Sequence, residues 1–245
     1  KVSFSVVNPQ TLGINYRPAV SNKLIVLPSE NHNSVLVRLS SYFEIPGSEL
    51  SLNLKSFNAA YNYLPQNGFA SINNRNQVLV NVVTNDSNYK EELLLLSFTE
   101  DVNPGQAPVL FASRNISLSD ESGASPVVKV IDAIGDNFFI SLNNSAYKID
   151  ADGNAKKIIN ERITHFFRFN NVLYAFGISS TVYRSLDVGE NWSIYLSGFF
   201  YYISKTFVFN DKLFIYQSDK IAHLDFENNK VSELINTGLA GNQVT

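Results

Sequence analysis

The chain has 245 residues, a net charge of −3, 44% hydrophobic and 13% aromatic residues, and neither cysteine nor methionine. This length suits one large all-β domain or two smaller domains, and the hydrophobic content argues against a disordered chain. The missing cysteines exclude disulfides, Cys-ligated zinc, iron–sulfur clusters and a cysteine nucleophile, while the slight acidity argues against a nucleic-acid partner.

The chain begins at Lys1 rather than at methionine, and it has no apolar run of about 18 residues that could cross a membrane. We therefore expect no transmembrane segment. A removed export signal and a boundary inside a longer chain both explain the missing start. A lipid anchor on a cysteine upstream of Lys1 is compatible with either explanation.

The predicted elements are almost all strands. Short apolar runs rich in Val, Ile, Leu, Phe and Tyr alternate with Asn, Asp, Gly or Ser, which is typical of strands joined by tight turns. The one stretch with helical character is Ser56–Tyr63. The main predicted strands are Lys23–Leu27, Val35–Leu39, Gln77–Val83, Glu92–Phe98, Val127–Ile131, Asn137–Leu142, Val172–Phe176 and Lys212–Tyr216.

An internal repeat runs through the second half of the chain. The segments that share a strand, an Asn/Asp/Gly turn and a second apolar strand are Ile131–Ile140, Phe166–Ala175 and Thr206–Ile215. Their equivalent positions Phe138, Leu173 and Leu213 lie 35 and 40 residues apart. A second hairpin follows each segment, with an Asp four residues after a hydrophobic residue in Tyr183–Asp187 and Ile221–Asp225.

A period of about 35 to 40 residues with four strands is the size of a propeller blade. The sequence therefore predicts an all-β protein, a β-propeller of four-stranded antiparallel blades. About five blades are expected. A closed five-bladed ring is one alternative, but we expect residues 1–245 to be one incomplete propeller that belongs to a six- or seven-bladed ring. The approximate blades are 20–65, 66–115, 125–160, 161–198 and 199–237, with 238–245 starting a further blade.

One short motif is specific for a type of fold. Residues 185–192 read Ser-Leu-Asp-Val-Gly-Glu-Asn-Trp and match the pattern Ser/Thr-x-Asp-x-Gly-x-x-Trp/Phe at Ser185, Asp187, Gly189 and Trp192. We expect the Asp187 carboxylate to accept backbone N–H groups of a turn, and Ser185 to bond back to the same turn. Gly189 should supply a backbone conformation that a side chain resists, and Trp192 should pack between blades.

This motif resembles the Asp-box (BNR, or sialidase-type repeat) β-propeller family. The resemblance covers one blade sharply and residues 127–245 by repeat pattern. It implies a structural role for the motif, on the rim away from the active face, in enzymes and non-enzymes alike.

The alternative function is a sialidase-like glycoside hydrolase or a glycan-binding propeller. Such an enzyme needs three arginines that clamp a carboxylate, a Tyr nucleophile paired with a Glu base, and an acid Asp. The nearest approach to the family's Phe/Tyr-Arg-Ile-Pro signature is Asn15–Pro18, which lacks the Ile. The arginines, which share no common register, are Arg17, Arg38, Arg75, Arg114, Arg162, Arg168 and Arg184. We expect no catalytic residue and no cofactor.

The chain offers two candidates for a metal site, a calcium-type loop and its histidines. Asp150–Asn154 resembles the start of one, but its Gly comes two positions early and no closing Glu follows at the required spacing, so a β-turn and no metal site are predicted. The three histidines, His32, His165 and His223, lie too far apart to favour a metal site, and His165 and His223 are expected to be structural.

Aromatic clusters are the last candidates. The run Phe199–Tyr202 could stack on a sugar or face a partner, but alternate residues of a strand point to opposite faces. Core packing is therefore the better expectation for this run, and the same holds for Phe166, Phe167 and Phe169.

Taken together, these features predict a non-catalytic, exported bacterial propeller that acts as a binding or scaffolding module, in the periplasm or at the outer cell surface. Its partner is expected to be a protein, with a surface glycan as the alternative, and not a nucleic acid. The polar loops where a partner is expected to bind are Asn62–Asn76, Thr84–Lys90, Thr99–Pro108 and Leu118–Ser125.

Overall fold

The computed structural model describes a large part of the chain. The described residues are 19–20, 24–28, 34–39, 49–53, 61–63, 70–84, 91–99, 108–118, 127–198, 205–210, 212–217, 220–225, 228 and 230–234. The aromatic run Phe199–Tyr202, most of the predicted partner loops and residues 238–245 lie outside them. No helix within the described residues is long and apolar enough to cross a membrane.

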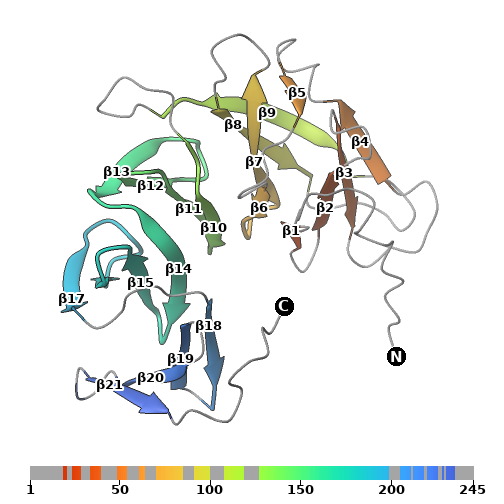
Figure 1. Cartoon of the computed structure of the whole chain (residues 1–245). Coiled ribbons are helices and arrows are strands. Elements are labelled where there is room, and N and C mark those ends of the chain that lie inside the picture. Colours follow the sequence, from red (N-terminus) through yellow and green to blue (C-terminus); the bar gives the residue numbers. More distant parts are fainter. Residues whose placement is uncertain are drawn as a thin grey trace. The chain divides into compact units, whose positions relative to one another are not determined.

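Every regular element of the described part is a strand, and four of the sheets are simple meanders (Figure 1). The first has β1 (Ala19–Val20), β2 (Leu24–Pro28), β3 (Ser34–Leu39) and β4 (Glu49–Asn53). The third has β10 (Val130–Ile134), β11 (Asn137–Ser141), β12 (Ala146–Ile149) and β13 (Ala155–Ile159). The fourth has β14 (Ile163–Phe169), β15 (Val172–Gly177), β16 (Thr181–Ser185) and β17 (Ser193–Ser197). The fifth has β18 (Lys205–Phe209), β19 (Lys212–Gln217), β20 (Lys220–Asp225) and β21 (Lys230–Leu234).

The second sheet departs from this plan because it has five strands. Its order is β5 (Tyr61–Tyr63), β7 (Gln77–Thr84), β8 (Glu91–Phe98) and β9 (Leu110–Ile116), and β6 (Ala70–Ile72) also pairs with β7. The helical character predicted at Ser56–Tyr63 is wrong for its last three residues, because β5 pairs with the end of β7. The same pairing places Tyr61–Tyr63 in the second sheet, whereas the predicted range 20–65 assigned it to the first.

Asparagine forms several of the tight turns, as the composition predicts. Asn170 and Asn171 join β14 to β15 with φ of 47° and 62°. Positive φ at both central residues matches the twist of a two-residue hairpin, and Asn tolerates it better than most residues do. The hairpin register then follows from the turn, with Phe169 opposite Val172.

The chain divides into two compact units. The first comprises Lys1–Phe138 and Ile149–Ala155, and the second comprises Phe139–Lys148 and Lys156–Thr245. The core of the first unit is built on β7 and β8, where Val78, Leu79 and Val80 and the residues of 93–96 are almost fully buried. Because these successive residues point to opposite faces, both faces of the sheet are covered there.

The core of the second unit lies between the fourth and fifth sheets. Phe176, Val182, Leu213, Ile215 and Leu224 are at most 1% exposed and form one cluster. Burying several large apolar side chains in one contiguous cluster supplies the main stabilising term for a small sheet pair.

The structure describes the three phenylalanines of β14 for which core packing is predicted. Phe166 and Phe169 are 2% and 8% exposed, which confirms the core packing expected for them. Phe167 is partly buried against the cluster, with its ring stacked 5.2 Å from Tyr174 and 5.3 Å from Phe176.

Candidate functional site

The Asp-box residues form one hydrogen-bonded turn between β16 and β17. Asp187 Oδ1 accepts the Asn191 backbone N–H at 2.9 Å and the Ser185 hydroxyl at 2.8 Å, and Oδ2 accepts the Asn191 side-chain amide at 2.7 Å. Ser185 Oγ in turn accepts the Gly189 N–H at 2.8 Å. These bonds to the ionised carboxylate hold the pKa of Asp187 far below its usual range.

Gly189 is required in this turn for two separate reasons. Its φ is +84°, in the left-handed region that side chains resist. A Cβ on Gly189 would also lie 2.6 Å from Cε1 of the fully buried Phe139 ring. Val188, one residue earlier, has a φ of 58°, and a positive φ is unusual for a β-branched residue. Its side chain is 61% exposed.

Trp192 closes the turn on the side of the core. Its indole N–H donates to the Gly189 carbonyl at 3.1 Å. Its ring lies edge-on to Phe139 of β11 and Phe166 of β14, with both centroids 6.3 Å away. Edge-to-face contacts of this kind add to the burial of the rings. Trp192 therefore joins strands of two neighbouring sheets within the second unit.

Sequence reasoning missed a lysine clamp on the same turn. Lys148 of β12, with a side chain only 9% exposed, donates to Glu190 Oε1 at 2.5 Å and to the Val188 carbonyl at 3.1 Å. Lys156 of β13 donates to Glu190 Oε2 at 2.9 Å and to the Glu190 carbonyl. Both lysines lower the pKa of Glu190. The pairs span 42 and 34 residues, so nothing local in the sequence indicates them.

The pairing of Asp187 with Asn191 recurs in two other turns, which lack the Ser and Trp of the motif. Asp150 accepts the Asn154 N–H at 2.8 Å and its side-chain amide at 2.9 Å. Asp225 accepts the Asn228 N–H at 3.2 Å and its side-chain amide at 2.8 Å. In both cases the carboxylate binds turn donors. In the described part of the chain, no three metal-ligating side chains gather into a group.

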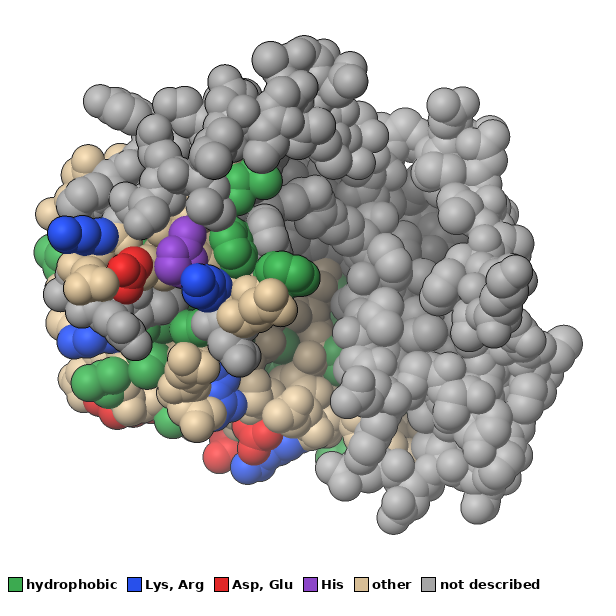
Figure 2. Space-filling view, turned by 90° about the horizontal axis from the view of Figure 1, so that it is seen from below, with side chains coloured by type: hydrophobic (Ala, Val, Ile, Leu, Met, Phe, Trp, Pro, Cys, Tyr) green, Lys and Arg blue, Asp and Glu red, His purple; other side chains and the backbone are tan. Residues whose placement is uncertain are grey.

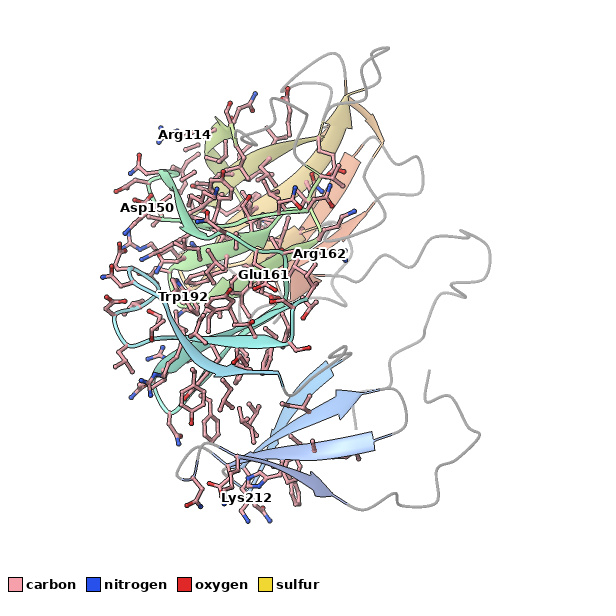
Figure 3. The ribbon with its side chains drawn as sticks, turned by 60° about the vertical axis from the view of Figure 1, so that its left-hand side comes forward. Arg114, Asp150, Glu161, Arg162, Trp192 and Lys212 are labelled. Atoms are coloured by element: carbon pink, nitrogen blue, oxygen red, sulfur yellow. The ribbon has the colours of Figure 1, made fainter. Side chains whose placement is uncertain are left out.

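A second polar cluster lies at the opposite end of the fourth sheet, where β14 begins. Glu161 Oε1 accepts the Ser179 N–H at 2.6 Å, and Oε2 accepts the Tyr183 hydroxyl at 2.7 Å. Burial, followed by this bond, raises the pKa of Tyr183 to about 12. Figure 3 labels Glu161 beside Arg162. The cluster ties the segment that enters β14 to the turn between β15 and β16.

The arginines are dispersed among separate contacts. Arg75 pairs with Asp136 at 2.9 Å, and Arg168 donates to Asn171 at 2.7 Å. Arg184 lies over the Tyr195 ring, 5.0 Å from its centroid. The Nε atoms of Arg162 and Arg184 are buried, and the described residues offer them no hydrogen-bond acceptor. Arg17 and the side chain of Arg38 lie outside the described residues.

Each of the two described histidines lies against a ring. His165 stacks on Phe167 at 6.1 Å, and His223 lies 5.5 Å from Phe214. His32 falls outside the described residues.

Large apolar side chains are exposed at outer strands and turns. On the face drawn in Figure 2 the hydrophobic, basic and acidic side chains are interspersed and do not form one patch. The exposed apolar residues of the described part are Val109, Phe111, Ile178, Leu186, Val188, Ile194 and Phe209. Three of them, Leu186, Val188 and Ile194, share the hairpin that carries the Asp-box.

No protein-family model matches the chain, and no curated protein sequence matches it. Among solved structures, dihydro-heme d1 dehydrogenase NirN in complex with DHE aligns over 90% of this chain and 46% of its own, with a TM-score of 0.56 and 13% identity. Apo AztD from Citrobacter koseri aligns over 89% of this chain and 71% of its own, with a TM-score of 0.51 and 13% identity. The complex of Kap60 with yeast RCC1 (Prp20) aligns over 84% of this chain and 54% of its own, with a TM-score of 0.52 and 7% identity.

These structures are β-propellers, and the likeness shows the fold of this chain. Together with the four-stranded antiparallel sheets, it confirms the predicted β-propeller class. The chain spans about half the length of the NirN chain. At this level of identity the comparison carries the architecture alone.

Proposed function

We propose that this chain is an exported bacterial propeller of the Asp-box type that works as a non-catalytic binding or scaffolding module, in a protein complex or at the cell surface. The observation that carries the proposal is a contrast between the polar and the large apolar side chains of the described residues. The polar clusters hold turns together, whereas large apolar side chains are left in contact with solvent.

The carboxylates of the polar clusters are occupied by hydrogen bonds within the fold. The carboxylates of Asp187, Glu190 and Glu161 all accept hydrogen bonds from turn backbone or from neighbouring strands. A general base or nucleophile needs a group poised near the working pH and open to substrate. Burial and the bond to Glu161 move the pKa of the Tyr183 phenol further above neutral pH, which is the opposite of activation.

The apolar side is concentrated on the Asp-box hairpin. Leu186, Val188 and Ile194 are 71%, 61% and 64% exposed. Single exposed apolar residues are ordinary, but three of the seven exposed ones share this hairpin. A protein partner that covers them gains the hydrophobic contribution of their burial. The complex of RCC1 with Kap60 is a precedent for a propeller of similar fold in a protein complex.

A photocrosslinking experiment tests this function. The photoreactive residue benzoylphenylalanine replaces Leu186 in one variant and Asn143, an exposed turn residue of the second unit, in the control. In the cells that produce the chain, we expect one discrete crosslinked protein from position 186 and none from 143. Repeating the experiment at each of the seven exposed apolar positions without any crosslink would contradict the proposal. Fractionation of the same cells tests export, with the chain expected outside the cytoplasm.

One observation favours the glycosidase alternative. Tyr183 and Glu161 form a hydrogen-bonded Tyr–Glu pair, which that chemistry requires. Against it, the bond to the Ser179 N–H fixes Glu161 in a turn, and the described arginines bind at separate places. Incubation with a fluorogenic sialoside should release no product. Turnover that is lost in Glu161→Gln would establish the enzyme instead.

A further inference from the structure

The strand β9 (Leu110–Ile116) is the outermost strand of the second sheet. It ends the order β5-β7-β8-β9, and among the described residues only β8 pairs with it. The N–H and C=O groups on its other side therefore form an edge that no described strand covers. Such an edge is a template for a further strand unless the protein protects it.

The side chains of β9 leave room for a further strand. Five consecutive residues, 111–115, are exposed. Because alternate residues point to opposite faces, both faces of the sheet are open at β9. The outer strands of the next two sheets are less open, since only two consecutive residues are exposed in each, 155–156 of β13 and 193–194 of β17.

A β-bulge places an aromatic ring at this edge. Ala112 pairs with Ser97 and Leu110 pairs with Phe98, so Phe111 is the extra residue and has no partner on β8. Phe111 is 67% exposed, and Val109 beside it is 56% exposed. Bulges commonly re-aim a side chain where a strand meets a ligand or ends its pairing.

The usual charged protection is also missing from β9. Outer strands are commonly blocked by lysine, and β13 carries the pair Lys156 and Lys157. The single charge on β9 is Arg114, whose guanidinium donates to the Asp152 carbonyl. Its stem packs so closely on the same turn that a Cβ at Gly153 would lie 3.0 Å from Arg114 Cδ. Figure 3 shows Arg114 beside the turn labelled Asp150.

We infer that the free edge of β9 binds an extended segment of a partner protein by strand addition. The partner segment places apolar side chains against Val109 and Phe111, and a neutral or acidic residue near Arg114. Backbone pairing defines this occupant, because a row of donors and acceptors at strand spacing is matched by another extended backbone. The inference names the binding mode for the proposed function and rests on it.

A second copy of this chain fits the edge less well. In the antiparallel register that pairs all of Leu110–Ile116 with itself, the two copies of Arg114 become diagonal neighbours on one face. Diagonal neighbours lie about 7–8 Å apart, so the two guanidiniums repel, whereas a partner strand with an acidic residue there is attracted.

The probe for this edge is a displayed library of random peptides about 12 residues long, selected on the whole chain. We expect enrichment of aromatic and β-branched residues at alternate positions, with few Lys or Arg. The best peptide is then made in two forms, each N-methylated at alternate backbone nitrogens. Only alternate N–H groups of an added strand face the protein, so one methylated form should lose binding and the other should keep it. If no peptide is selected, or if both methylated forms bind as well as the parent, strand addition at β9 is wrong.

Substitutions on β9, with a control on β17, test where the peptide binds. Phe111→Lys combined with Ser113→Lys should weaken binding of the selected peptide by about tenfold or more. The matched control, Ser193→Lys combined with Ser197→Lys, places the same two charges at exposed positions of the outer strand β17 and should leave binding of the peptide unchanged. Phe111→Ser, a milder change, should weaken binding less and guards against misfolding of the double variant. Equal binding by the double variant and by the native chain would overturn the inference.

Two further outcomes separate the possibilities. A dimer seen by light scattering and abolished by the double variant would assign the edge to a second copy and overturn the partner assignment. A protein crosslinked at Leu186 together with no effect of the β9 variants would leave the binding function standing and remove this binding mode.

Discussion

The Asp-box turn offers a test in which strain and crowding can be separated. Gly189→Ala adds one methyl group to a residue with a φ of +84°. That methyl would lie 2.6 Å and 2.8 Å from two carbons of the Phe139 ring. Phe139 is fully buried and lies against Phe166 and Trp192, so it has little freedom to move away.

The expected loss of stability has two parts. A left-handed conformation costs a residue with a side chain about 1–2 kcal/mol. Overpacking a filled core costs about 1–3 kcal/mol more. Gly189→Ala should therefore lower the free energy of unfolding by about 2–5 kcal/mol.

Gly198 provides the matched control. Its φ is +80°, almost the same, but nothing lies within 4 Å of the place its Cβ would take. Gly198→Ala should therefore cost only the conformational part, about 1–2 kcal/mol. Trp192 is the only tryptophan of the chain, so its fluorescence during urea unfolding reports on this turn. Equal losses in the two variants would refute the steric argument, and no loss in either would refute both parts.

Three further predictions concern the polar clusters of the second unit. Because Lys148 and Lys156 hold the pKa of Glu190 below its ordinary value of 4.5, its contribution is present above that pH and is lost as the pH falls through the lowered pKa. Glu190→Gln should therefore be less stable at neutral pH and lose less on acidification, and parallel acid profiles for the two proteins would contradict this. Tyr183 should ionise near pH 12, and its contribution to stability should fall as the pH rises above 10.0, since the folded state keeps the proton longer. The ultraviolet absorbance of tyrosinate should lose one late-titrating group in Tyr183→Phe. Gly177→Ala would bring a Cβ to 2.5 Å from Glu161 Oε1, so it should displace Glu161 and cost about 1 kcal/mol in urea unfolding, and an unchanged midpoint would argue against the contact.

The parts of this structure that could be predicted are the local ones. Strands follow from apolar runs bounded by turn residues, and the Asp-box bonds join residues two to four positions apart, such as Asp187 and Asn191. Side chains that close a short turn depend on local spacing, which the sequence displays directly.

The contacts that the sequence does not predict depend on the register between strands. Glu161 and Tyr183 meet across 22 residues, and Lys148 and Glu190 across 42, through sheets whose pairing no local pattern specifies. The helical character predicted at the end of Ser56–Tyr63 failed for the same reason, because the pairing of β5 with β7 outweighed local propensity.

The hydrogen-bonded pairing of an Asp with a following Asn explains why the sequence repeat is clear in some blades and weak in others. Only one turn has kept Ser185, Gly189 and Trp192, yet the same two bonds, from backbone N–H and side-chain amide of one Asn to one Asp, occur in all three turns. An Asn side chain that pairs with an Asp three or four residues earlier satisfies the turn by itself. Gly189 and Trp192 serve another purpose, since they bring the turn against Phe139 of a strand in the preceding sheet. Turn closure by Asp and Asn is thus shared, whereas attachment to the preceding sheet uses different residues, since the Asp150 turn lies against Ile116 and Arg114 of β9 through Gly153.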